Sequence, residues 1–198
     1  KSSRFPQMKE NQTPGEAAAF VNYWADQGFT SFKAYIGVHK PTLQASIDAA
    51  HKRKLKITGH LDAVTYKEAA ALGIDNLEHG FLASTDFVVG KKANETAASG
   101  LAIKSLGNLD IDSDSVKQFI QYLIERKVGI TSSLAVFEGV NTTQPRPDQD
   151  AINAMSADTR DFYLQRLVAV KSLAGPNDRD KAFAKTAKME KKFYDMGG

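Results

Sequence analysis

The sequence predicts an α/β protein with a parallel sheet and helices packed outside it. Helix-type and strand-type patterns alternate over residues 13–80, only short turn segments separate them, and another helix-strand pair follows over residues 113–136. Alternation of this kind favours parallel strands joined by helical crossovers. The length of 198 residues suits one domain, so we predict a single domain over residues 1–198 with an insertion around residues 81–112.

The first half of the chain is predicted to contain three helix-strand pairs. Thr13-Pro14-Gly15-Glu16 and Thr65-Tyr66-Lys67-Glu68 both match a capping box, in which a threonine and a glutamate satisfy the first backbone N–H groups of a helix. Segments rich in β-branched and aromatic residues predict strands. The expected helices lie near residues 13–28, 41–54 and 65–73, and the expected strands near residues 29–36, 55–60 and 74–79.

The second half is less regular. The insertion is expected to be partly helical, and residues 113–127 carry a clear amphipathic stripe that predicts a helix. Residues 130–136 then predict a fourth strand, and residues 141–149, with two prolines, predict a loop. Two late helices are expected near residues 157–173 and from residue 177, where they would pack on the exterior or shape a pocket entrance.

Composition excludes several classes of protein. The net charge is only +3 and the basic residues are scattered, which argues against a nucleic-acid partner. There is no cysteine, so disulfides and thiolate metal sites are excluded. No apolar run is long enough to span a bilayer, and no phosphate-binding or dinucleotide-binding glycine motif is present. The cellular location stays open.

Three residues stand out because each lies on, or at the end of, a predicted strand. Lys33 lies within an apolar strand, and His60 and His79 end the next two strands. The carboxyl ends of consecutive parallel strands converge on one face of the sheet, where ligands bind in α/β folds. These side chains could therefore form a metal site or a catalytic site, although ordinary structural roles stay open.

The segments around these residues resemble a known family, the metal-dependent amidohydrolase superfamily, and in particular its imidazolonepropionase-like and Xaa-Pro dipeptidase-like branch. Strands four to seven of that family resemble Phe32-Lys33-Ala34-Tyr35, Ile57-Thr58-Gly59-His60, Asn76-Leu77-Glu78-His79-Gly80 and Ile130-Thr131-Ser132-Ser133-Leu134. The resemblance covers residues 13–140. It implies that the chain is part of a (β/α)8 barrel of the TIM type, with about four of the parallel strands and their outer helices.

The resemblance also implies a chemistry, the hydrolysis of C–N bonds in small amides, dipeptides or cyclic amides. Lys33 matches a lysine that is carboxylated and bridges two divalent metals, usually zinc. His60 and His79 match ligands of the second metal. A carbamate forms from a neutral amine, so a desolvated Lys33 is expected. Tyr35 shares a face with Lys33, and His39 follows the same strand, so both are weaker candidates for substrate contacts.

Two parts of the family pattern are absent from this sequence. There is no His-x-His pair, and the general-base aspartate of strand eight is expected beyond Gly198. We therefore expect a fragment that is inactive by itself. Because four parallel strands leave two unpaired edges, we also expect association with the missing part of the barrel or with a second copy.

Two other functions are also compatible with the sequence. One is a non-catalytic binding or assembly module with a degenerate amidohydrolase fold, which would explain the missing His-x-His pair and aspartate. The other is a (β/α) lyase or aldolase in which Lys33 forms a Schiff base with a carbonyl substrate.

Overall fold

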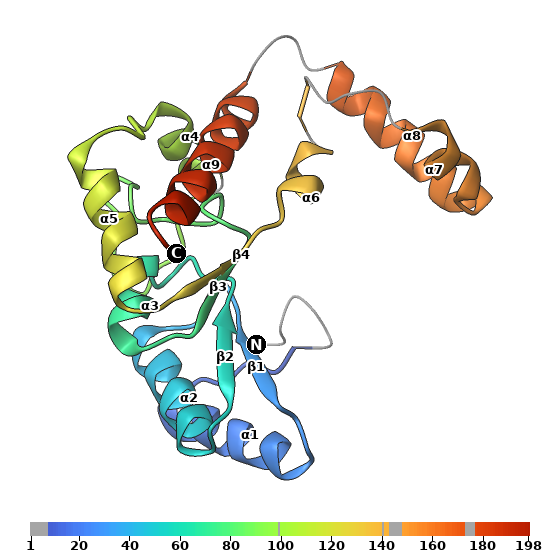
Figure 1. The fold of residues 1–198 in the computed structure, drawn as a ribbon. Coiled ribbons are helices and arrows are strands. Elements are labelled where there is room, and N and C mark those ends of the chain that lie inside the picture. The colour runs from blue at the N-terminus through green and yellow to red at the C-terminus, as the bar shows by residue number, and fades with distance from the viewer. Residues whose placement is uncertain (1–7, 99, 140, 143–147, 173–176) are drawn as a thin grey trace.

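The structure, a computed structural model, describes residues 8–98, 100–139, 141–142, 148–172 and 177–198. Four short strands form one parallel sheet in the order β1-β2-β3-β4 (Figure 1). They are β1 (Ser31–Ala34), β2 (Lys56–Gly59), β3 (Asn76–Glu78) and β4 (Gly129–Thr131). The predicted α/β class is thus confirmed. A parallel sheet whose strands follow chain order is compatible with part of a TIM-type barrel.

Helices connect the strands as crossovers. The helices before β4 are α1 (Pro14–Asp26), α2 (Lys40–Lys52), α3 (Tyr66–Leu72), α4 (Leu101–Asn108) and α5 (Asp114–Glu125). Those after β4 are α6 (Leu134–Glu138), α7 (Gln149–Ala154), α8 (Ala157–Lys171) and α9 (Asp178–Asp195). Both predicted capping boxes are confirmed, with Thr13 and Thr65 accepting hydrogen bonds from the backbone of Glu16 and Glu68.

The two faces of the sheet differ in polarity because alternate residues of a strand point to opposite sides. Ile57 and Leu77 are buried in the core, where they lie with apolar side chains of α2, α3 and α5. On the opposite face the register places Lys33 beside Thr58 and Thr58 beside Asn76. The core therefore lies between the sheet and the helices, and the other face of the sheet is polar.

Helix α9 returns to the body of the protein and completes the core. It packs along α4 and buries Ala182, Met189 and Phe193. The ring centroid of Phe193 lies 6.1 Å from that of Phe81, at the start of the insertion. The sequence predicted that the late helices pack on the exterior or shape a pocket entrance; α9 packs on the body of the protein, and α4 shows that the insertion is partly helical.

Helix α8 differs from α9. It extends away from the sheet together with α7 (Figure 1). Phe162 and Val168 are 67% and 70% exposed, and no residue of α8 is buried. The described part of this helix does not pack on the exterior of the body, since its apolar residues do not form a single stripe that could bury against it. The alternative, that it shapes a pocket entrance, stays a prediction.

The predicted fourth strand was also partly wrong. Strand β4 ends at Thr131, and α6 begins at Leu134 within the stretch expected to be extended. The Ser132 hydroxyl accepts a hydrogen bond from the Leu134 amide, and the Ser133 carbonyl accepts from the amides of Val136 and Phe137. Serines that bond the local backbone in this way favour helix starts, which outweighs the strand preference of Ile130 and Val136.

Candidate functional site

The ends of β2 and β3 bring two histidines together. The ring centroids of His60 and His79 lie 4.4 Å apart, with an angle of 73° between the ring planes. Tyr35 lies edge-on to His60 at 4.9 Å, and Phe137 of α6 lies 6.2 Å from His79. The convergence of these two strand ends was predicted from the spacing of the histidines, and it places two imidazoles within reach of one small ligand.

His79 has an unusual backbone conformation. Its φ angle is 70°, in the left-handed region, and that of Gly80 is 59°. Such a conformation costs a non-glycine residue about 1–3 kcal/mol, so neighbouring contacts must hold it. The Gly80 amide donates to the Thr131 carbonyl at 2.9 Å, and His79 Nδ1 lies 2.9 Å from Ser133 Oγ. This bond holds Nδ1 and leaves Nε2 as the ring nitrogen available to a ligand.

An ion pair lies on the polar face beside the histidines. Lys33 Nζ is 3.3 Å from Glu78 Oε2, and the Thr58 hydroxyl donates to Glu78 Oε1 at 2.9 Å. The Lys33 side chain is 42% exposed. The expectation of a desolvated lysine was therefore wrong for this chain, because Lys33 projects from the polar face and not into the core.

Glu78 and Ser133 were not predicted from the sequence as site residues. Glu78 could have been found from the two-residue period of a strand, since Asn76 and Glu78 must share one face of β3. No comparable periodic signal marked Ser133, because its position depends on β4 ending earlier than expected.

The electrostatics of this cluster keep both histidines neutral. Burial lowers the pKa of His60 to about 4, helped by His79 and Lys33 and opposed by Glu78. Burial and Lys33 also lower the pKa of His79. Burial alone would raise the pKa of Glu78, but the Thr58 hydrogen bond and Lys33 outweigh it and lower that pKa. At neutral pH the cluster therefore has neutral imidazoles beside an ionised carboxylate.

These donors fit part of a metal site. Neutral imidazole is the form that coordinates a metal, and a hydrogen bond to the second ring nitrogen, as His79 makes to Ser133, typically orients a ligand. Over the described ranges of the chain, no three histidine, cysteine, aspartate or glutamate side chains are grouped to hold a metal ion. Any metal site at His60 and His79 would thus need a donor of another kind, such as a modified Lys33.

The two weaker candidates from the sequence differ in position. Tyr35 lies against His60, as described above. His39 is exposed, immediately precedes α2, and makes no capping hydrogen bond with its side chain. The structure thus places Tyr35 in the cluster, while the role of His39 stays a prediction.

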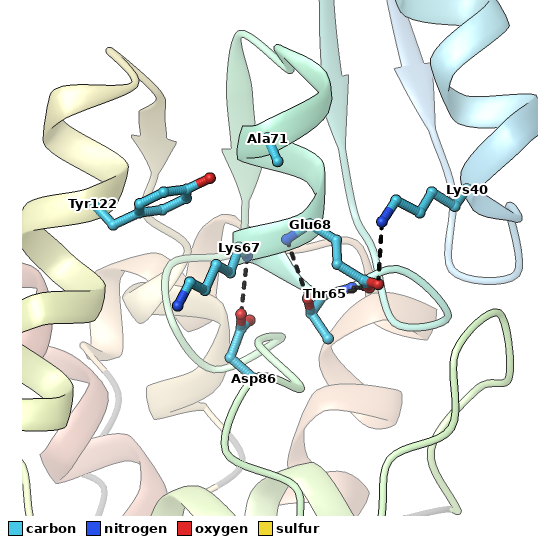
Figure 2. Close-up of a pocket in the computed structure, with 7 residues that line it drawn as sticks. All are labelled: Lys40, Thr65, Lys67, Glu68, Ala71, Asp86 and Tyr122. Carbon is cyan, nitrogen blue, oxygen red and sulfur yellow. Dashed lines mark hydrogen bonds and ion pairs between the residues drawn. The ribbon is translucent and has the colours of Figure 1, made fainter.

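A separate shallow pocket lies around the start of α3 (Figure 2). The Asp86 carboxylate accepts hydrogen bonds from the backbone amides of Tyr66 and Lys67, and Lys40 Nζ lies 3.6 Å from Glu68 Oε1. The other lining residues are Thr65, Ala71 and Tyr122. Since its carboxylates already have partners within the pocket, we assign them a structural role in capping α3.

Comparison with known proteins gives distant structural likenesses. No family model matches the chain, and no curated protein matches it. One similar solved structure is a protein of uncharacterised function with 12% identity and a TM-score of 0.44, and the match covers 90% of this chain and 36% of the other. A second, from Bifidobacterium longum, is described as a "putative prolidase"; it has 13% identity and a TM-score of 0.49, with 98% and 40% covered.

The chain therefore spans less than half the length of either of these two structures. Likenesses this distant carry no argument about activity. None of the helices in the part of the chain that the structure describes is long and apolar enough to cross a membrane. The case for function depends on the strand-end cluster itself.

Proposed function

We propose that the chain is part of a metal-dependent hydrolase that cleaves C–N bonds in small amides, dipeptides or cyclic amides. The observation that supports it most is the pair of neutral imidazoles, His60 and His79, at 4.4 Å between ring centroids where two parallel strands end. Adjacent strand ends are where α/β folds place their chemistry. The resemblance of the surrounding motifs to amidohydrolases points to the same role.

In this proposal each residue of the cluster has a separate task. His60 and His79 bind one divalent metal, most simply zinc, and Ser133 orients the His79 ring. Lys33, as a carbamate, would supply oxygen ligands for this metal and for a second one. A bound metal lowers the pKa of water and polarises a carbonyl, which is what amide hydrolysis needs. Tyr35 and His39 are proposed to contact the substrate.

Carboxylation of Lys33 would change its pairing with Glu78. The present ion pair, at 3.3 Å, favours the charged ammonium, whereas a carbamate is negative and would be repelled by the Glu78 carboxylate. Metal binding would compensate, because two cations neutralise both the carbamate and the carboxylate. We therefore propose that carboxylation and metal binding occur together. The resemblance assigns the remaining ligands and the general base to residues outside these 198, so hydrolysis is proposed for the complete natural polypeptide.

The Lys33–Glu78 ion pair favours a second candidate, a binding module without catalysis. In that case Lys33 stays an ammonium and the polar face of the sheet binds a partner or a small polar molecule. The two proposals differ in the state of Lys33 when metal and carbon dioxide are both supplied.

The test supplies zinc and ¹³C-labelled bicarbonate and measures hydrolysis by the complete polypeptide. The hydrolase proposal expects a carbamate signal assigned to Lys33, release of amine from a dipeptide panel, and loss of both in His60→Ala. His51→Gln is the matched control, since His51 lies in the last turn of α2 and pairs with Asp75. A polypeptide that binds zinc without carbamate or hydrolysis would favour the binding module.

A further inference from the structure

We infer that Tyr66 is a positioning residue for His79, acting through a hydrogen bond from its buried hydroxyl to the backbone on both sides of that histidine. Tyr66 is the first residue of α3 and its side chain is fully buried. The inference rests on the proposed metal site for what His79 does, although not for how His79 is held.

The hydroxyl of Tyr66 bridges two backbone carbonyls. Its oxygen lies 2.9 Å from the carbonyl oxygen of Glu78 and 2.9 Å from that of Gly80. These are the residues directly before and after His79. Burial raises the pKa of Tyr66 above its ordinary value, so the hydroxyl keeps its proton and remains a donor. One shared hydrogen bond therefore holds the backbone on both sides of His79, the histidine whose ring orientation the proposed site depends on.

The backbone needs such a contact because it turns through an unfavourable conformation. The φ angles of His79 and Gly80 are both positive, at 70° and 59°. A left-handed histidine relaxes toward the commoner regions unless its surroundings hold it. Relaxation would rotate the imidazole away from His60, because the direction of the Cα–Cβ bond follows the backbone angles.

Helix α9 confines the same turn from another direction. A Cβ atom on Gly80 would lie only 1.7 Å from Glu190 Oε1, so the carboxyl group occupies the space that a side chain would need. Glu190 Oε1 is buried and has no hydrogen-bond partner within the described residues. The carboxyl group also makes a hydrogen bond with Ser132, which follows β4. This bond and the packing against Gly80 hold Glu190 in place, and Glu190 limits how far the turn can move.

A merely structural tyrosine would account for burial but not for the placement of its hydroxyl. Tyr66→Phe removes the hydroxyl and keeps the ring, and Tyr122→Phe is the matched control at a half-buried tyrosine of α5. In the 198-residue chain we measure NMR cross-relaxation between the ring protons of His60 and His79, followed by zinc titration. Tyr66→Phe is expected to retain the fold, lose the ring-to-ring signal and bind zinc about 10–100-fold more weakly, as is usual for outer-shell changes.

The outcomes separate this inference from the proposed function. A ring-to-ring signal of wild-type strength in Tyr66→Phe overturns the positioning role, whatever the zinc affinity. Loss of the signal in a chain whose wild type binds no zinc supports the positioning role and overturns the metal site. If Tyr66→Phe does not fold, Glu190→Ala decides: a weakened ring-to-ring signal supports the confined turn, and an unchanged signal contradicts it.

Discussion

Lys33 on β1 and Glu78 on β3 form an ion pair across the intervening strand β2, with 3.3 Å between Nζ and Oε2. Thr58 of β2 lies between them and donates to the same carboxylate. The polar face of the sheet is therefore a connected network and not a set of isolated side chains. In the form the structure shows, this network stabilises an uncarboxylated Lys33, which gives the first prediction.

Glu78→Gln is expected to increase carboxylation of Lys33. The change removes the negative charge that stabilises the ammonium and that would repel a carbamate. The ¹³C carbamate signal at fixed bicarbonate and pH should rise severalfold in the zinc-free chain. Glu125→Gln, at an exposed position of α5, is the control and should leave the signal unchanged. A smaller signal in Glu78→Gln would show that Glu78 assists carboxylation and does not oppose it.

The stability of the chain is expected to fall as the pH drops from 6.5 to 4. The pKa of His60 is about 4 in the folded chain and 6.5 when unperturbed, so in this window the unfolded chain binds a proton that the folded chain does not. Stability is thus full above pH 6.5 and is lost progressively toward pH 4. With allowance for partial exposure, the loss is about 1–2 kcal/mol.

Urea unfolding at several pH values measures this slope. His60→Gln removes one titrating group and should reduce the slope between pH 4 and 6.5, and His79, whose pKa burial also lowers, accounts for the slope that remains. If wild type and His60→Gln lose stability in parallel, His60 is not the group responsible.

Leu77→Ala is expected to destabilise the chain by about 2–5 kcal/mol. Leu77 is fully buried between the sheet and the helices, so truncation removes apolar contacts and leaves a cavity. Val168→Ala, at a 70% exposed position of α8, should change stability by less than about 0.5 kcal/mol. Denaturant midpoints of both variants provide the comparison, and a large effect at Val168 would mean that α8 packs against something in solution.

Asp86→Ala is expected to cost about 1–3 kcal/mol of stability. The carboxylate accepts hydrogen bonds from the amides of Tyr66 and Lys67 and from the Ser84 hydroxyl, so its removal leaves the first two N–H groups of α3 without this acceptor, while the Thr65–Glu68 capping box remains. Figure 2 shows the bond between Asp86 and Lys67. Asp86→Asn keeps an acceptor and should lie between Asp86→Ala and wild type. Equal thermal midpoints for Asp86→Ala and wild type would refute the capping role.

Much of the fold followed from local sequence patterns. The capping boxes at Thr13 and Thr65 and the amphipathic stripe of α5 predicted helices because their determinants lie within a few residues of one another. The meeting of His60 and His79 was also predictable, since the order of parallel strands along the chain brings their carboxyl ends together.

The remaining features depend on tertiary contacts that no local pattern contains. The exposure of Lys33 depends on which face of the sheet the helices cover. The early end of β4 reflects backbone bonding by Ser132 and Ser133. Tyr66 meets the turn at His79 from α3, the helix just before β3, and Glu190 meets it from α9, far along the chain. No local pattern marks either side chain as a contact of this turn.

Zinc titration of the 198-residue chain by calorimetry, with bicarbonate supplied so that Lys33 can be carboxylated, tests the central claim most directly. Saturable binding of a zinc ion is expected, which is lost in His60→Ala and in His79→Ala and is retained in His51→Gln. Since His60 and His79 are neutral at pH 7, binding should weaken as the pH falls and these imidazoles take up protons. A chain that binds no zinc, or that binds it equally well without both histidines, would contradict the proposed metal site.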